Sequence, residues 1–182
     1  MAKRTFIAVN LPPELKEELG KIIGDLKKIN PDYGIKWTSP ENLHLTLHFF
    51  GDLNEEQIAL VEEGINKITE KTAAFEMKTG KFGCFPNERE PRIIFIEITD
   101  SKIIRILIDE LEVMLQNLNF PVDAKPWKAH LTLGRIKDGS SCKTDGIEFP
   151  PQVFRVKSIE LMESQLTAEG PIYSTIKSFP LK

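Results

Sequence analysis

The chain has few cysteines and lacks a long apolar run, the features of disulfide-linked and of membrane-spanning proteins respectively. Its only cysteines are Cys84 and Cys142, and they lack the CxxC spacing of metal and redox sites. A secreted disulfide scaffold would use more cysteine, so we expect two free thiols in a cytoplasmic protein. No apolar run approaches the roughly 20 residues that a membrane helix needs. The short apolar stretch behind the basic N-terminus ends at two prolines, which does not fit a signal peptide.

A strong excess of either charge is also missing. The 24 basic and 27 acidic side chains leave a net charge of −3. This argues against nonspecific coating of nucleic acid, because such binding relies on many phosphate contacts. A small basic groove remains compatible with the sequence, since residues 124–137 hold four cations and no acidic residue. A solvated surface cluster is the other interpretation of this segment.

Histidine is scarce, yet two of the three histidines lie in copies of one run. His44 begins the sequence HLTL at 44–47, and His130 begins it again at 130–133. Alternating apolar and polar residues are typical of a half-buried strand. The leucines would then point into a core, while each histidine and the following Thr46 or Thr132 share the opposite face. We therefore expect two His/Thr pairs to face one cleft.

The two runs lie in repeated contexts. A buried strand at 5–9 precedes a helix that begins at Pro13, and a strand at 92–97 precedes a helix capped by Asp100 or Ser101. Nearly equal lengths of chain then lead to each histidine. This duplication predicts an α+β fold with two pseudo-symmetric lobes, each an antiparallel sheet with packed helices, and a catalytic cleft between them. Residues 1–182 would form a single bilobal domain.

The remaining segments fit the same fold class. Residues 35–37 and the regions 153–163 and 172–179 have strand character, and Asn54 with Gln57 forms a capping box that opens a further helix. Residues 138–151 are rich in Gly, Ser, Asp and Pro, which predicts a surface loop.

Paired histidines offer a definite chemistry. With an ordinary pKa near 6.5, histidine gives or takes a proton close to neutrality. Two histidines on opposite sides of a reacting group can act as acid and base, each contributing roughly 10²–10⁴ in rate. The threonine hydroxyls can donate to phosphoryl oxygens. One His-x-Thr run would be weak evidence, but two copies at matching places favour a catalytic pair.

A metal site is the rival interpretation of the histidines. His44 and His48 have the i, i+4 spacing of some zinc-binding helices, but Leu45 stands where those helices carry glutamate. On a strand the two histidines would be about 13 Å apart and could not bind one ion. His48 would lie on the same strand face as His44, where it could touch substrate phosphate or ribose, or stand at the rim of the cleft. Four aromatic residues near the motifs are candidates for stacking on a base, namely Trp37, Phe49, Phe85 and Trp127.

These features resemble the two-histidine (2H) phosphoesterase superfamily, which carries paired HxTx motifs in a duplicated α+β frame. Within it, the chain resembles the bacterial and archaeal RNA 2′,3′-cyclic phosphodiesterases, also called 2′-5′ RNA ligases. The similarity runs from end to end, and its segments are Arg4–Val9 with Leu11-Pro12, Trp37, Pro40–Leu47 with Phe50-Gly51, Phe85-Pro86, Pro91-Arg92, His130–Arg135, Leu166-Thr167 and Gly170–Tyr173.

The resemblance implies hydrolysis of a 2′,3′-cyclic phosphate at an RNA 3′ end, leaving a 2′-phosphate, without metal, ATP or a covalent intermediate. By matching positions, His44 would be the proton donor to the departing 3′ oxygen and His130 the proton acceptor that activates water. Thr46 and Thr132 would hold nonbridging oxygens. A 5′-hydroxyl in place of water would give 2′-5′ ligation. We expect RNA as the partner, no membrane or cofactor, and a monomer.

Two further positions carry expectations from the resemblance. Arg135 matches a family position that contacts phosphate, although strict alternation puts it on the face opposite His130. A bulge near Gly134 would resolve this conflict. His48 stands where the family more often has lysine. Two alternative functions stay open: a phosphodiesterase acting on a small cyclic nucleotide or a 2′-5′ oligonucleotide, and an RNA-end binding module.

Overall fold

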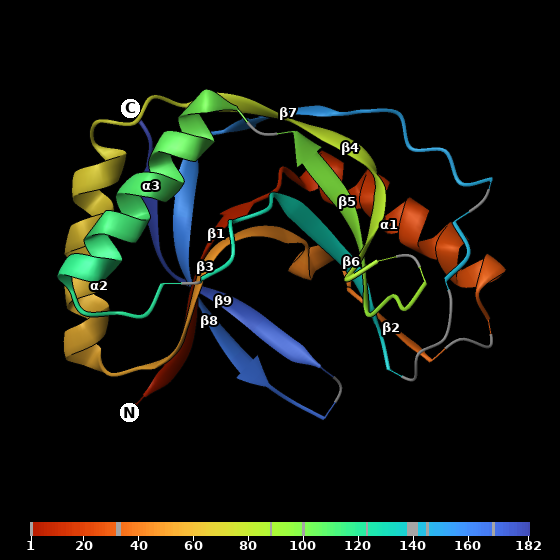
Figure 1. The fold of residues 1–182 in the computed structure, drawn as a ribbon, viewed down its shortest axis with the longest axis horizontal. Helices are drawn as coiled ribbons and strands as arrows, with labels where there is room; N and C mark the ends of the chain where they lie inside the picture. The colour runs from red at the N-terminus through yellow and green to blue at the C-terminus, as the bar shows by residue number, and fades with distance from the viewer. Residues whose placement is uncertain are drawn as a thin grey trace.

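The structure is a computed structural model that describes residues 2–31, 34–87, 89–99, 101–122, 124–137, 142–144, 146–168 and 170–182. Within these ranges the elements follow in the order β1 (Lys3–Asn10), α1 (Pro13–Ile29), β2 (Ile35–Trp37), the 3₁₀ turn η1 (Pro40–Asn42), β3 (His44–Leu53), α2 (Glu55–Thr69), β4 (Phe75–Phe85), β5 (Ile93–Thr99), α3 (Lys102–Asn117), β6 (His130–Ile136), β7 (Val153–Val156), β8 (Ser158–Leu166) and β9 (Pro171–Pro180) (Figure 1).

The helices begin where the local sequence predicts. Pro13 is the first residue of α1, where its missing N–H costs no helical hydrogen bond. Both hydrogen bonds of the predicted capping box are present at Asn54 and Gln57. Ser101 caps α3, because its Oγ accepts from the Ile104 N–H at 3.3 Å; the alternative cap, Asp100, lies outside the described residues. None of these helices combines the length and apolar character needed to cross a membrane.

The strands form one antiparallel sheet in the order β7-β4-β5-β6-β3-β1-β8-β9, with β2 added alongside β6. This order is symmetric about its centre, since β6 and β3 carry the two histidines and β5 and β1 are the strands that precede α3 and α1. The halves meet at a single registered pair, Leu45 with Leu131, which are equivalent residues of the two motifs. The α+β class is therefore confirmed, with the expected two sheets joined edge to edge into one.

Two details of the strands differ from expectation. The region 153–163 forms two strands, because β7 pairs with β4 while β8 pairs with β1 in the other half of the sheet. No local pattern indicated β4, since lysines and the glycines Gly80 and Gly83 weaken the pattern of a strand. The described part of the predicted loop at 138–151 contains no helix or strand, and residues 138–141 and 145 lie outside the described residues.

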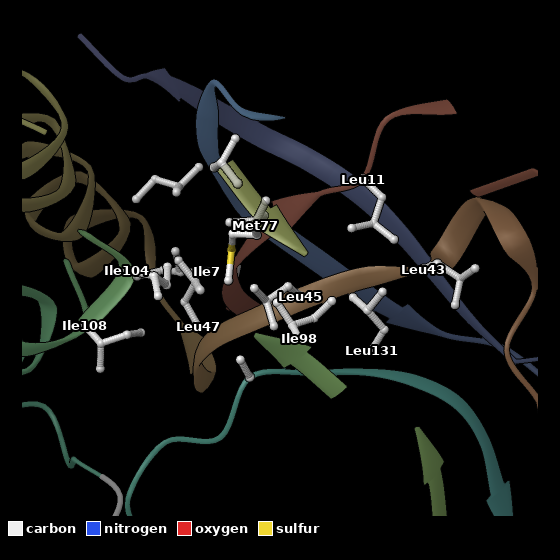
Figure 2. Packing of buried hydrophobic residues seen from close by; sticks show 14 of the residues in the cluster. Ile7, Leu11, Leu43, Leu45, Leu47, Met77, Ile98, Ile104, Ile108 and Leu131 are labelled. Carbon is white, nitrogen blue, oxygen red and sulfur yellow. The ribbon is translucent and has the colours of Figure 1, made fainter. Parts of the chain in front are cut away.

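All three helices pack on one face of the sheet. Their apolar stripes join strand side chains such as Ile7, Leu45 and Leu131 in one buried cluster. Figure 2 shows Ile104 of α3 beside Ile7 of β1, with Leu45 and Leu131 close together at the junction of the halves. A smaller cluster on the other face contains Phe6 and Ala8 of β1. Because side chains alternate along a strand, this other face is the one that carries the histidines.

Candidate active site

The two HLTL runs meet at the centre of the sheet. Because Leu45 lies opposite Leu131 on antiparallel strands, His44 and Thr46 lie beside Thr132 and His130. These four side chains, together with Arg135, line one cavity of about 1000 Å³. The site residues predicted from the repeated motif are thus brought together, as the alternation of the two strands requires.

Both imidazoles are held in the same way. His44 Nδ1 donates to the carbonyl oxygen of Asn42 at 2.7 Å, and His130 Nδ1 donates to that of Lys128 at 2.7 Å. A carbonyl oxygen can only accept, so Nδ1 carries the hydrogen in each ring. This fixes the tautomer and leaves Nε2 as the atom that takes or gives a proton.

Aromatic rings fix the orientation of each imidazole. The His44 ring centroid lies 4.9 Å from Phe6 and 5.1 Å from Tyr173. In the other half, the His130 ring lies edge-on to Phe85, with the centroids 5.0 Å apart, and 5.5 Å from Phe95. Each histidine is therefore supported by two rings, which limits its movement and removes water from part of its surface.

Burial is the largest influence on the pKa values of His44 and His130. It lowers the pKa of His44, with the neighbouring Lys16, His130 and Arg135 lowering it further and the bond to Asn42 opposing them. Burial also lowers the pKa of His130, with Arg135 adding to the effect and the bond to Lys128 opposing it. With both pKa values lowered, the neutral form of each imidazole is favoured at neutral pH, and an anion bound between them would favour protonation.

The walls of the cavity carry further cations. Arg4, Lys36 and Arg135 line it, and Glu41 is the one acidic residue among the described residues of the lining. The guanidinium carbon of Arg4 lies 4.8 Å from the centroid of the Phe49 ring. The cavity is thus suited to an anion with an attached apolar or aromatic group.

A bulge brings Arg135 to the cavity, and the expectation of an irregularity near Gly134 is confirmed. Phe95 of β5 pairs with Thr132, but Ile94 pairs with Gly134, so Leu133 is an extra residue in β6. The extra residue reverses the alternation and puts Arg135 on the face of His130.

The same irregularity in the other half contradicts the expectation for His48. Ala8 of β1 pairs with Thr46, but Ile7 pairs with His48, so Leu47 is the extra residue there. His48 consequently shares the face of Ile7, which is buried in the helix-side core, and its ring contacts Phe50 at 4.9 Å. Phe49 takes the position on the cleft face that alternation had assigned to His48.

The candidate stacking residues fall into two groups. Trp37 and Phe49 line the cavity with the histidines. The indole of Trp37, however, packs on the helix-side core: Trp37 is paired with Gly134, whose missing Cβ atom would lie 3.0 Å from Cε3 of that indole. Phe85 and Trp127 line a separate cavity on the other side of His130. Trp127 also links the two halves of the sheet by a hydrogen bond, because its Nε1–H donates to the Thr46 carbonyl of β3 at 3.0 Å.

Several residues of the site were missed from the sequence. Asn42 both accepts from His44 and donates through Nδ2 to the Pro171 carbonyl at 2.9 Å, which fixes β9 beside the site. Arg4, Lys36 and Tyr173 reach the cavity from β1, β2 and β9. No local pattern marks these positions, because their proximity depends on how distant strands pair.

The structure does not bring the residues of the metal interpretation together. His44 and His48 lie on opposite faces of β3. Among the residues that the structure describes, no group of three His, Cys, Asp or Glu side chains could hold a metal ion. Neither Cys84 nor Cys142 forms a disulfide.

Comparisons with known proteins converge on one family. The family model described as LigT like Phosphoesterase matches residues 9–95. The RNA 2′,3′-cyclic phosphodiesterase of Archaeoglobus fulgidus is 32% identical over 180 residues, which cover 97% of this chain and 99% of the relative. The protein of the same name from Methanocaldococcus jannaschii is 33% identical over 182 residues, with coverage of 97% and 99%.

Solved structures agree on the fold. A crystal structure of a protein from Thermus thermophilus superimposes with a TM-score of 0.80 at 28% identity, covering 98% of this chain and 97% of that one. The structure of E. coli LigT complexed with 3′-AMP gives a TM-score of 0.80 at 21% identity, with coverage of 100% and 99%.

Proposed function

Because this chain belongs to the family of LigT-like phosphoesterases, which includes the RNA 2′,3′-cyclic phosphodiesterases, we propose that it hydrolyses RNA 2′,3′-cyclic phosphate ends to 2′-phosphate ends. One observation carries the proposal. Two histidines with the same Nδ1 anchoring lie on either side of the symmetric junction of the sheet and line one cavity with two threonines. In-line displacement at phosphorus needs an acid and a base on opposite sides, and this arrangement supplies both.

The proposed reaction is a single displacement. His130 Nε2 removes a proton from water as the water oxygen attacks phosphorus. The bond from phosphorus to the 3′ oxygen breaks, and His44 Nε2 delivers its proton to that oxygen. The product carries a 2′-phosphate and a free 3′-hydroxyl, and exchange of protons with solvent restores both histidines.

The remaining site residues stabilise charge. Thr46 and Thr132 would donate hydroxyl hydrogen bonds to the nonbridging oxygens, whose negative charge develops in the transition state. Arg135 would bind the same phosphate group, since it lines the cavity beside both histidines and lowers the pKa of each. His48 has no place in this mechanism, because it lies on the core side of β3.

We further infer the oligomeric state, the metal requirement and the location of the enzyme. The enzyme would act as a monomer, with residues 1–182 as one catalytic domain, because both motifs lie on adjacent strands of a single sheet. It would work without a metal ion, since the two imidazoles supply acid and base. The small number of cysteines supports a cytoplasmic location.

The direct test is to incubate the protein, in excess chelator, with a short RNA ending in a 2′,3′-cyclic phosphate and to identify the product. We expect a 2′-phosphate. A 3′-phosphate would refute the assigned leaving oxygen, and a loss of activity that zinc restores would support the metal interpretation.

Assays with other substrates distinguish the alternative functions. Faster opening of a mononucleoside 2′,3′-cyclic phosphate, or cleavage of a 2′-5′ linked oligonucleotide, would reassign the substrate. Tight binding of the cyclic-phosphate RNA without turnover would indicate an RNA-end binding module.

A further inference from the structure

The 3₁₀ turn η1, which precedes β3, ends in the carbonyl group that anchors His44. Two backbone hydrogen bonds of 3.0 and 3.1 Å close this turn, donated by the N–H groups of Asn42 and Leu43. The Asn42 carbonyl oxygen then accepts from His44 Nδ1 at 2.7 Å. Because the anchor belongs to the turn, a displacement of η1 would also displace the imidazole.

Helix α1 fixes η1 through two contacts. The Lys16 ammonium donates to the Glu41 carbonyl oxygen at 2.7 Å. About one helical turn later, Gly20 approaches the turn closely, since a Cβ atom there would lie 2.9 Å from Cγ of Pro40. Residues four apart lie on the same face of a helix, so both contacts hold the turn from the same side. The bond from Lys16 thus fixes the peptide unit that joins Glu41 to Asn42.

A buried carboxylate compensates the charge of Lys16. Glu160 of β8 is 5% exposed. Its oxygens accept three hydrogen bonds, from the Asn10 N–H at 3.1 Å and from the hydroxyls of Ser158 and Ser178 at 2.5 and 3.2 Å. Burial lowers the pKa of the half-buried Lys16, and Glu160 is one of two carboxylates whose charge opposes this shift. The ammonium is therefore held near a negative charge that is itself fixed in place.

The charge of Lys16 also acts on His44. After burial, the ammonium is one of the groups that lower the pKa of His44, together with His130 and Arg135 of β6, while the edge of the Tyr173 ring packs against the imidazole from β9. A lower pKa makes the protonated imidazole a stronger acid, which favours transfer of its proton to a departing oxygen. One side chain thus affects both the position and the acidity of His44.

We propose that Lys16 is a positioning residue for the proton donor of the proposed reaction, on which this inference rests. Its ammonium holds the Glu41–Asn42 peptide, and the Asn42 carbonyl then keeps His44 Nε2 aligned with the departing 3′ oxygen. The described lining of the active-site cavity does not include Lys16. It therefore acts through His44 and not on the substrate.

Two cyclic-phosphate substrates that differ only in the departing atom test this role. One has the natural 3′ oxygen, which needs a proton as it departs. The other has sulfur at that position, which departs as a thiolate without a proton donor. A residue that acts through the proton donor should matter for the first substrate and not for the second. His44→Ala is the reference for complete loss of the donor.

Lys16→Met removes the hydrogen bond and the charge. With the oxygen substrate we expect kcat to fall about tenfold, with KM within about twofold of the wild type, because a misplaced catalytic group slows the reaction. With the sulfur substrate, the kcat of this variant should approach the wild-type value. Lys16→Arg should retain most of the activity on the oxygen substrate, because a guanidinium N–H can donate to the same carbonyl.

Lys21→Met is the matched control for the change of charge. Lys21 lies on the same helix, is exposed, and pairs with Glu18 of that helix at 2.8 Å. Loss of such an exposed pair has little effect on stability. This variant should keep the wild-type kcat on both substrates.

Gly20→Ala disturbs the same turn without a change of charge. The added methyl group must displace Pro40, so we expect the same result, a loss with the oxygen substrate that disappears with the sulfur substrate. Gly24→Ala is its control, since nothing lies within 4 Å of a Cβ atom there. It should keep the wild-type kcat on both substrates.

Wild-type kcat for Lys16→Met on the oxygen substrate would overturn the proposal. An equal loss on both substrates would also overturn it, because Lys16 would then serve the fold or substrate binding. A loss of the same size in Lys21→Met would attribute the effect to the overall charge of α1. No hydrolysis by the wild type, or a His44→Ala variant that the sulfur substrate does not rescue, would instead refute the proposed function or its choice of proton donor.

Discussion

Each catalytic candidate in this chain owes its properties to a few close neighbours. A backbone carbonyl fixes the tautomer of His44 and of His130, and two aromatic rings restrict each imidazole. Burial is the first cause of the lowered pKa at both positions. The neutral form of both imidazoles is therefore favoured at neutral pH, and the proposed reaction requires one of them to gain a proton.

This requirement predicts the pH dependence. The value of kcat/KM reports the free enzyme, in which both pKa values lie below the ordinary value of about 6.5. It should rise with pH as the base is deprotonated, fall as the acid is deprotonated, and reach its maximum below about pH 6.5. A bound phosphodiester anion favours imidazolium, so the maximum of kcat should lie at higher pH than that of kcat/KM.

Initial rates across pH 4–9, with the chemical step shown to be limiting, would check this. A kcat/KM that rises steadily through neutral pH would contradict an acid and base with lowered pKa values.

At the scale of elements, the bulges decide which residues reach the cleft. The alternation of side chains along a strand correctly predicted the sheet face of four residues that precede the bulges, namely His44, Thr46, His130 and Thr132. The extra residues Leu47 and Leu133 reverse the side chains that follow them, in β3 as far as a second irregularity at Phe50. A bulge depends on pairing with another strand, so the sequence of β3 alone could not show that His48 faces the core. Gly134 did give such a signal in β6.

Close contact between β4 and β5 sets the wall behind His130. A Cβ atom at Gly83 would lie 2.5 Å from Cζ of Phe95, so Gly83→Ala should displace the Phe95 ring and loosen His130. We expect kcat for cyclic-phosphate hydrolysis to fall about tenfold or more, with a smaller change in KM, because a misplaced catalytic group costs rate.

Gly24→Ala in α1 is the matched control, since nothing lies within 4 Å of a Cβ atom there. It should leave kcat unchanged and stabilise the helix slightly. Equal kcat values for both variants would show that the contact of Gly83 with Phe95 does not position His130.

At the scale of the whole molecule, the duplicated order of strands explains how one chain builds a two-sided site. The helices cover one face of the sheet, which leaves the histidines on the other, and the halves meet at Leu45 and Leu131. The repeat in the sequence predicted this plan. It could not predict β4 or the approach of Arg4 and Tyr173, because these depend on pairings between segments far apart in the chain.

The site also affects the stability of the whole fold toward acid. His44 and His130 have lower pKa values when folded than when unfolded, so the unfolded chain binds more protons once the pH falls below about 6.5. This linkage contributes nothing above about pH 7.5 and destabilises the folded protein progressively as the pH falls toward the native pKa values.

The double variant His44→Gln with His130→Gln lacks this linkage. The Tm difference, wild type minus variant, should be constant between pH 7.5 and 8.5 and should decrease between pH 6.5 and 5. A difference that stays constant across the whole range would contradict the lowered pKa values of the pair.

The central claim is that His44 and His130 act on opposite sides of phosphorus as acid and base. A 2′,3′-cyclic substrate with sulfur in place of the 3′ oxygen tests it most directly, because a departing thiolate needs no proton donor. On the oxygen substrate, His44→Ala and His130→Ala should each lower kcat/KM by roughly 10²–10⁴, and His48→Gln should have little effect. On the sulfur substrate, His44→Ala should approach the wild-type rate while His130→Ala stays impaired. Equal impairment of both variants on both substrates would contradict the account, and the reverse pattern of rescue would exchange the two roles.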